Sequence, residues 1–146
     1  MTSSLQESFL TDRFVSALQF AHDVHRSQIR KDTTIPYVSH LLSVAGLVLE
    51  SGGDEDLAIA GLLHDAVEDA KEISGEEMSD RIRTKFGDRV ADIVDGCSDA
   101  KSSPGGSKPP WRSRKEAYLE HLRSASNDVL RVSIADKVHN ARSIAT

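Results

Sequence analysis

The feature that most constrains this chain is a run of ionisable side chains set directly after an apolar segment. Residues 57–63 read Leu-Ala-Ile-Ala-Gly-Leu-Leu, and residues 64–69 continue as His-Asp-Ala-Val-Glu-Asp. If both stretches form one helix, residues three and four apart share a face, which gathers His64, Asp65, Glu68 and Asp69 on one side. An imidazole and three carboxylates are costly to bury without a compensating positive charge. We therefore predict a divalent metal beside this helix, with two carboxylates left for proton transfer.

Length and charge limit the class of protein. With 146 residues the chain can bury one core, and we expect a single domain over residues 1–146. The net charge of −5 gives no general attraction for nucleic acid or anionic membranes, so a phosphorylated substrate requires local basic residues or a metal. Cys97 has no second cysteine to pair with, the N-terminus lacks the pattern of a signal peptide, and residues 41–49 are too few to span a bilayer. We expect a cytoplasmic protein without nucleic-acid or membrane partners.

Helical periodicity and capping signals run through most of the chain. Apolar residues recur at helical spacing in segments between Phe14 and Ala141. The predicted helix boundaries are marked by residue types that favour helix ends, namely Pro36, Gly52, Asp54, Ser74 and Ser113. An alternating strand pattern, hairpin turn signals and internal repeats are missing from the sequence. We therefore predict an all-α fold.

One segment differs from the helical pattern. Residues 98–112 are rich in proline, glycine and serine, which predicts a long loop within the domain. The composition leaves open whether this loop is a lid over a site or an insertion without a role. We expect Trp111 to anchor the loop on the core, and the role of the basic residues around it stays open.

Two residues outside the acidic run are further candidates for metal ligands. His40 lies in the second predicted helix, and Asp136 is an acidic residue within an apolar helical stripe. Sets of two histidines and two carboxylates suit manganese, iron, cobalt or zinc. Each residue also has an ordinary explanation. A lone histidine on an apolar face is more commonly a hydrogen-bonded core residue, and Asp136 could pair with Lys137 or Arg142.

A family resemblance joins these motifs. The matching segments span most of the chain: residues 25–32 (His-Arg-Ser-Gln-Ile-Arg-Lys-Asp), 36–40 (Pro-Tyr-Val-Ser-His), 62–69 (Leu-Leu-His-Asp-Ala-Val-Glu-Asp), 86–94 (Phe-Gly, then Val90, Ile93 and Val94) and 135–140 (Ala-Asp-Lys-Val-His-Asn). In this order and spacing, the chain resembles HD-domain metal-dependent phosphohydrolases. More narrowly, it resembles the hydrolase domain of the RelA/SpoT alarmone enzymes and their small stand-alone relatives. The resemblance implies an HD-domain helical bundle.

The same resemblance implies roles for individual residues. It implies that one divalent metal, typically Mn²⁺ in that family, is held by His40, His64, Asp65 and Asp136. Glu68 and Asp69 match the acidic pair that handles the attacking water. Arg30 and Lys31 match the basic pair that packs against the purine base and the adjoining substrate, Asn140 matches a nucleotide-contacting position, and Ser143 stands where the family often has threonine.

The implied reaction is removal of the 3′-pyrophosphate from guanosine 3′,5′-bis(diphosphate) (ppGpp) or pppGpp, giving GDP or GTP. One alternative is a broader HD phosphohydrolase acting on other nucleotides or phosphate esters; the Arg-Lys and Glu-Asp pairs favour the alarmone. A second alternative is a nucleotide-binding HD module without catalysis, against which the full set of expected ligand and acid positions argues. Members of the family usually continue with further helices that help to wall the pocket. We therefore expect either a shortened or a naturally short form of such a domain.

Overall fold

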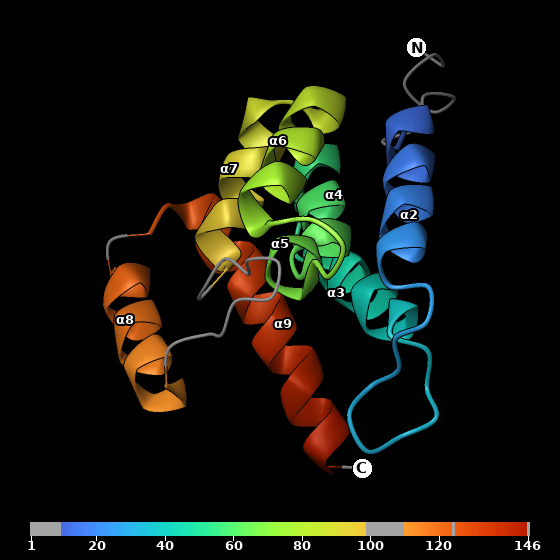
Figure 1. Ribbon diagram of the computed structural model, residues 1–146. Helices are drawn as coiled ribbons and strands as arrows, with labels where there is room; N and C mark the ends of the chain where they lie inside the picture. Colours follow the sequence, from blue (N-terminus) through green and yellow to red (C-terminus); the bar gives the residue numbers. More distant parts are fainter. Residues whose placement is uncertain (1–9, 99–109, 124, 146) are drawn as a thin grey trace.

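The computed structural model describes residues 10–98, 110–123 and 125–145, and helices dominate these ranges (Figure 1). In chain order they are α2 (Asp12–Val24), α3 (Val38–Glu50), α4 (Glu55–Leu63), α5 (Ala66–Asp69), α6 (Gly75–Phe86), α7 (Asp88–Cys97), α8 (Trp111–Arg123) and α9 (Asn127–Ala145). Over the same ranges, β structure is limited to an isolated antiparallel bridge between Ile29 and Pro36. The all-α prediction is confirmed.

Helix α4 lies at the centre because its side chains are apolar on every face. Residues 57–63 are all buried, and α4 packs against α2, α3, α7 and α9. A helix that is hydrophobic all round is stable only when neighbours cover all of its faces. Asp54 caps it as predicted, accepting a hydrogen bond of 3.0 Å from the backbone N–H of Leu57. Gly61 permits close packing, since a Cβ there would lie only 3.3 Å from Cα of Ala45 in α3.

The helix predicted through residues 57–69 is interrupted, and this corrects the sequence interpretation. Helix α4 ends at Leu63, His64 and Asp65 form a turn, and α5 begins at Ala66. His64 Nδ1 donates to the carbonyl oxygen of Gly61 at 2.7 Å. In an unbroken helix that carbonyl accepts from the backbone N–H four residues later, that of Asp65. The imidazole therefore competes with the helical hydrogen bond at the point where the helix breaks.

Two other predicted boundaries also differ from the structure. Pro36 does not open α3; it pairs with Ile29 in the bridge, two residues before α3 begins. The loop predicted over residues 98–112 is wrong at its end, because α8 already begins at Trp111. An ion pair of 3.1 Å between Arg112 and Glu116, four residues apart, supports that first turn. Residues 99–109 lie outside the described residues.

Helix α9 contacts both the core and the segment that precedes α3. At 19 residues it is the longest described helix, and it packs against α3, α4 and α7. Its C-terminal end lies beside the connection between α2 and α3, which carries Arg30 (Figure 1). Helix α8 lies to the side and contacts α9 through Tyr118, whose hydroxyl is 2.9 Å from Oγ of Ser133. Among the described helices, none combines the length and the apolar character needed to cross a membrane.

Candidate metal centre

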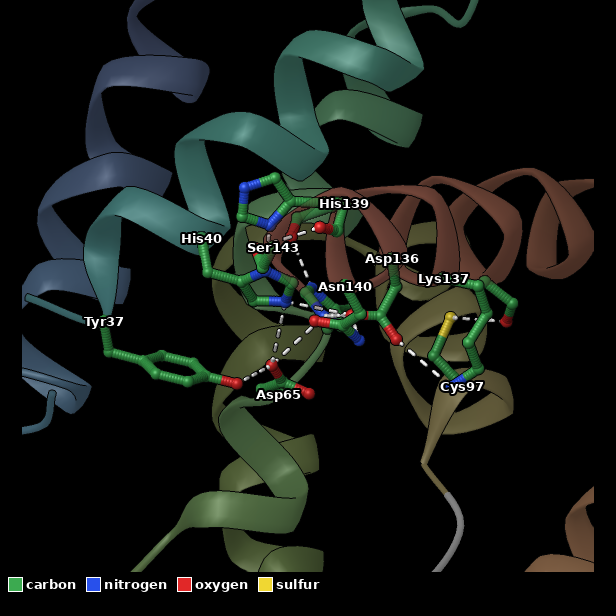
Figure 2. A network of polar contacts seen from close by, with 12 residues as sticks. Tyr37, His40, Asp65, Cys97, Asp136, Lys137, His139, Asn140 and Ser143 are labelled. Atoms are coloured by element: carbon green, nitrogen blue, oxygen red, sulfur yellow. Dashed lines mark hydrogen bonds and ion pairs between the residues drawn. The ribbon is translucent and has the colours of Figure 1, made fainter. Parts of the chain in front are cut away.

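The four predicted ligands converge from three separate parts of the fold. His40 comes from α3, His64 and Asp65 from the turn between α4 and α5, and Asp136 from α9. Each offers one nitrogen or oxygen atom, and these four atoms all lie within 4.8 Å of one another. Figure 2 shows His40, Asp65 and Asp136 pointing toward one another within this network. The two histidine side chains are 2% and 3% exposed, whereas Asp65 and Asp136 are 18% and 16% exposed. The cluster is therefore buried on its histidine side and open on its carboxylate side.

The break after α4 explains how adjacent residues reach one point. On a continuous helix, neighbouring side chains diverge by about 100°. Here His64 Nε2 lies 3.1 Å from Oδ2 of Asp65 and 3.2 Å from Oδ1 of Asp136. His40 Nε2 lies 2.9 Å from the same Asp136 oxygen. The turn thus aims His64 and Asp65 at the same space, which a regular helix would not do.

Shifted pKa values show that this cluster attracts positive charge. Burial lowers the pKa of His64, but the charge of Asp65 and hydrogen bonds to Asp136 and Asp65 outweigh it and raise that pKa well above 6.5. Burial raises the pKa of Asp65, yet the neighbouring His64 and the hydroxyl of Tyr37 lower it to about 2. Against the effect of burial, hydrogen bonds from His40 and His64 hold the pKa of Asp136 below its usual range. Two carboxylates and two imidazoles are a donor set that fits a divalent cation.

A second layer of contacts orients these side chains, and sequence reasoning missed two of its members. Tyr37 donates its hydroxyl to Oδ2 of Asp65 at 2.5 Å. His139 Nδ1 lies 2.7 Å from Nδ1 of His40. Helical spacing offered a signal for both, because Tyr37 precedes His40 by three positions and His139 follows Asp136 by three.

A cavity of about 190 Å³ opens beside the cluster. Besides the four residues, its lining consists of Tyr37, Glu68, Cys97, Lys115, Tyr118, Ser133, Lys137 and Asn140. Glu68, one of the two predicted acids, therefore faces the same space, and its carboxylate is 3.9 Å from a guanidinium nitrogen of Arg114. Asp69 is not among the lining residues and accepts a hydrogen bond of 3.2 Å from Gln28 instead. The structure thus separates the two acids that sequence analysis treated as a pair.

Three of the four predicted substrate-contacting residues form one cluster at the end of α9. Arg30 Nη2 donates to Oδ1 of Asn140 and to Oγ of Ser143, each at 3.3 Å. Asn140 also donates from Nδ2 to Oδ1 of Asp136 at 3.3 Å, which links this cluster to the candidate ligands. Lys31 is exposed on the loop next to Arg30 and does not line the cavity.

The predicted anchoring of Trp111 is wrong. Its side chain is 67% exposed at the start of α8. Two lysines line the cavity instead, Lys115 from the same helix and Lys137 from α9. The helix that Trp111 begins thus contributes a cation to the cavity.

Known proteins are similar to this chain in sequence. A cyanobacterial protein from Synechocystis sp., named a probable guanosine-3′,5′-bis(diphosphate) 3′-pyrophosphohydrolase, is 37% identical over 134 residues, which cover 88% of this chain but only 16% of that protein. The protein from Xenopus tropicalis named guanosine-3′,5′-bis(diphosphate) 3′-pyrophosphohydrolase MESH1 is 35% identical over 133 residues, covering 89% of this chain and 68% of that protein. The chain therefore spans most of a small relative and a small part of a large one.

A solved structure agrees with these sequence matches. It is described as a metazoan ortholog of SpoT that hydrolyses ppGpp, and it superimposes with a TM-score of 0.79 at 28% identity, covering 92% of this chain and 71% of that one. The family model of the HD domain matches residues 17–146. Since that match includes all four converging side chains and nearly the whole sequence, the chain belongs to the HD domain family.

Proposed function

We propose that this protein hydrolyses guanosine 3′,5′-bis(diphosphate), using one divalent metal ion, and that this ion is Mn²⁺. Water attacks the phosphorus attached to the ribose 3′ oxygen and the bond between them breaks, so the products are GDP and pyrophosphate. The main support is the convergence of two histidines and two aspartates beside a cavity that also exposes Glu68. The names of the relatives from Synechocystis and Xenopus point to the same substrate.

His40, His64, Asp65 and Asp136 are the proposed ligands. A bound divalent ion supplies positive charge that makes water more acidic and offsets negative charge developing on a phosphoryl group. The protein orients these ligands before the ion arrives, since His64 donates to Gly61 and Tyr37 donates to Asp65. Such outer contacts set which ring nitrogen is free to bind a metal.

Glu68 is the proposed acceptor of the proton from the attacking water. Its carboxylate faces the cavity, and it lies four positions after His64. General bases of this kind contribute about 10² to 10⁴ in rate. Asp69, the other predicted acid, has a positioning role in this proposal, because its bond with Gln28 connects α5 to the loop that carries Arg30.

Arg30, Lys31, Asn140 and Ser143 are the proposed substrate contacts. A guanidinium is planar and stacks on a base, whereas an ammonium acts as a point charge toward phosphate. Arg30 donates to Asn140, which lines the cavity, and to Ser143, and these contacts support a position for its planar group beside the substrate. Lys31, exposed beside it, suits a phosphate that extends toward solvent.

A cytoplasmic location stays a prediction from the sequence.

The test is product formation by the Mn²⁺-loaded protein with guanosine tetraphosphate, followed by ion-exchange chromatography. We expect GDP and pyrophosphate in equal amounts. Glu68→Gln should retain the metal and lose at least about 100-fold in turnover, whereas Asp136→Asn should lose the metal itself. Glu72→Gln changes an exposed glutamate just beyond α5 and serves as the matched control with unchanged turnover.

Other outcomes separate the alternatives. Metal binding with hydrolysis of other nucleotides but not of guanosine tetraphosphate would favour a broader HD phosphohydrolase. Nucleotide binding without any turnover would favour a module that has lost catalysis. Glu68→Gln with the turnover of the unsubstituted protein would refute the role proposed for that carboxylate.

A further inference from the structure

His139 makes the closest contact to His40 that lies outside the four-residue cluster. The two Nδ1 atoms are 2.7 Å apart, and the ring centroids are separated by 4.9 Å with 35° between the planes. Figure 2 shows His139 on α9 directly beside His40. Two imidazole nitrogens at this distance share one proton, so one of them donates and the other accepts. Which residue donates decides what the far nitrogen of His40 can do.

For His64, the hydrogen-bond partner identifies which ring nitrogen carries the proton. Its Nδ1 faces the carbonyl oxygen of Gly61 at 2.7 Å, and a carbonyl can only accept. His64 in its neutral form therefore carries its proton on Nδ1 and presents an unprotonated Nε2 to the cluster. The Nδ1 of His40 faces an imidazole instead, which can either donate or accept.

The geometry points to His139 as a positioning residue that accepts the Nδ1 proton of His40 and so leaves Nε2 of His40 free to bind the metal. A ligating imidazole must be unprotonated at the bound nitrogen, so a neutral His40 keeps its proton on Nδ1 and must donate there. This inference rests on the proposed metal site, and it does not depend on which nucleotide is the substrate.

Helix α9 carries both His139 and the candidate ligand Asp136. His139 follows Asp136 by three residues, so one face of α9 supplies a candidate ligand and the partner that orients a second one. Without the metal, His40 Nε2 donates to the Asp136 carboxylate at 2.9 Å, and this proton must leave when the metal binds. Both ring nitrogens of His40 are therefore held by the same helix. A displacement of α9 would disturb two of the four ligands at once.

Two substitutions of equal size test the acceptor. His139→Asn retains an oxygen at the δ position where Nδ1 now lies, and His139→Leu places a methyl group there. The measurement is the dissociation constant for Mn²⁺, followed from the electron paramagnetic resonance signal of the free ion, without any substrate. We expect the Leu variant to raise this constant about 10- to 100-fold, as loss of such outer contacts generally does, and the Asn variant to stay within about threefold of the unsubstituted protein.

Helix stability provides the internal control. Leucine is a better helix former than asparagine, so a role confined to supporting α9 predicts that the Leu variant performs at least as well as the Asn variant. His22→Leu, at an exposed histidine of α2, should leave the constant unchanged. Equal constants in the two His139 variants, whether both normal or both weakened, would overturn the inference. Failure of the unsubstituted protein to bind Mn²⁺ would overturn the metal site as well, whereas metal binding without turnover bears on the substrate alone.

Discussion

Tyr37→Phe removes one hydroxyl group and tests whether the contacts around the proposed metal ligands matter. That hydroxyl donates to Asp65 at 2.5 Å, and the acceptor side chain is 18% exposed. Hydrogen bonds to charged groups contribute about 1.5–3 kcal/mol, and partial exposure favours the lower end. We expect the metal-free protein to lose about 1.5 kcal/mol of stability, which lowers the unfolding midpoint by about 4 °C for a chain of this size. A less firmly held carboxylate should also raise the dissociation constant for Mn²⁺ about tenfold.

Tyr118→Phe is the matched control, because it removes a hydroxyl from the same cavity. This hydroxyl pairs with uncharged Ser133 at 2.9 Å rather than with a proposed ligand. Its loss should cost about 1 kcal/mol of stability and leave Mn²⁺ binding unchanged. Calorimetry of both variants, with and without Mn²⁺, compares the two effects directly. Unchanged Mn²⁺ affinity in Tyr37→Phe would refute the reasoning, because the hydroxyl would then stabilise the metal-free and metal-bound states equally.

Three further predictions concern a proposed substrate contact, a helix cap and a closely packed glycine. Arg30→Ala should raise the Michaelis constant for guanosine tetraphosphate more than it lowers turnover, and the reverse pattern in steady-state kinetics would contradict a binding role. Asp54→Ala should cost about 1 kcal/mol of stability near neutral pH in urea unfolding, whereas Asp54→Asn keeps the cap. Burial raises the pKa of Asp54, but hydrogen bonds from Arg89 and the backbone of Leu57 outweigh it and lower that pKa below 3.8. The stabilisation that depends on the Asp54 charge is therefore complete above pH 3.8 and is lost as the pH falls through the lowered pKa of the folded protein. Gly61→Ala should be destabilising by about 1 kcal/mol, since overpacking against the backbone of Ala45 exceeds the gain in helix propensity; greater stability in urea would show that α3 can move aside.

Much of the helical fold could be predicted because its signals are local. The cap at Asp54 and the cap at Ser74 both depend on residues within one helical turn, and the structure confirms both. Two other predictions were wrong. Pro36 is predicted to open a helix, but it pairs with Ile29 in an isolated bridge two residues before α3 begins. Trp111 was expected on the core, yet it begins a helix and is largely exposed.

The candidate ligands could also be predicted from the sequence, by residue type and by family resemblance, whereas their mutual geometry could not. His40 and Asp136 are 96 residues apart, and no local pattern states which atoms of such residues meet. The contacts of Tyr37 and His139 were also missed. Aromatic residues on apolar helix faces more commonly belong to the core, so neither side chain stood out as a partner of a candidate ligand. Helical spacing indicated only that they could face the same way as a ligand.

The sequence by itself determined that the fold is helical, where an imidazole and several carboxylates would need a cation, and which four residues are candidates to hold it. Tertiary structure decided how those residues meet. The break at His64 and Asp65 turns two neighbouring side chains toward one point, and the packing of α3 and α9 against α4 brings His40 and Asp136 to the same place. The physical reason is range: periodicity and capping act within a few residues, whereas a metal site requires atoms from distant segments to lie within a few ångströms, which only packing can arrange.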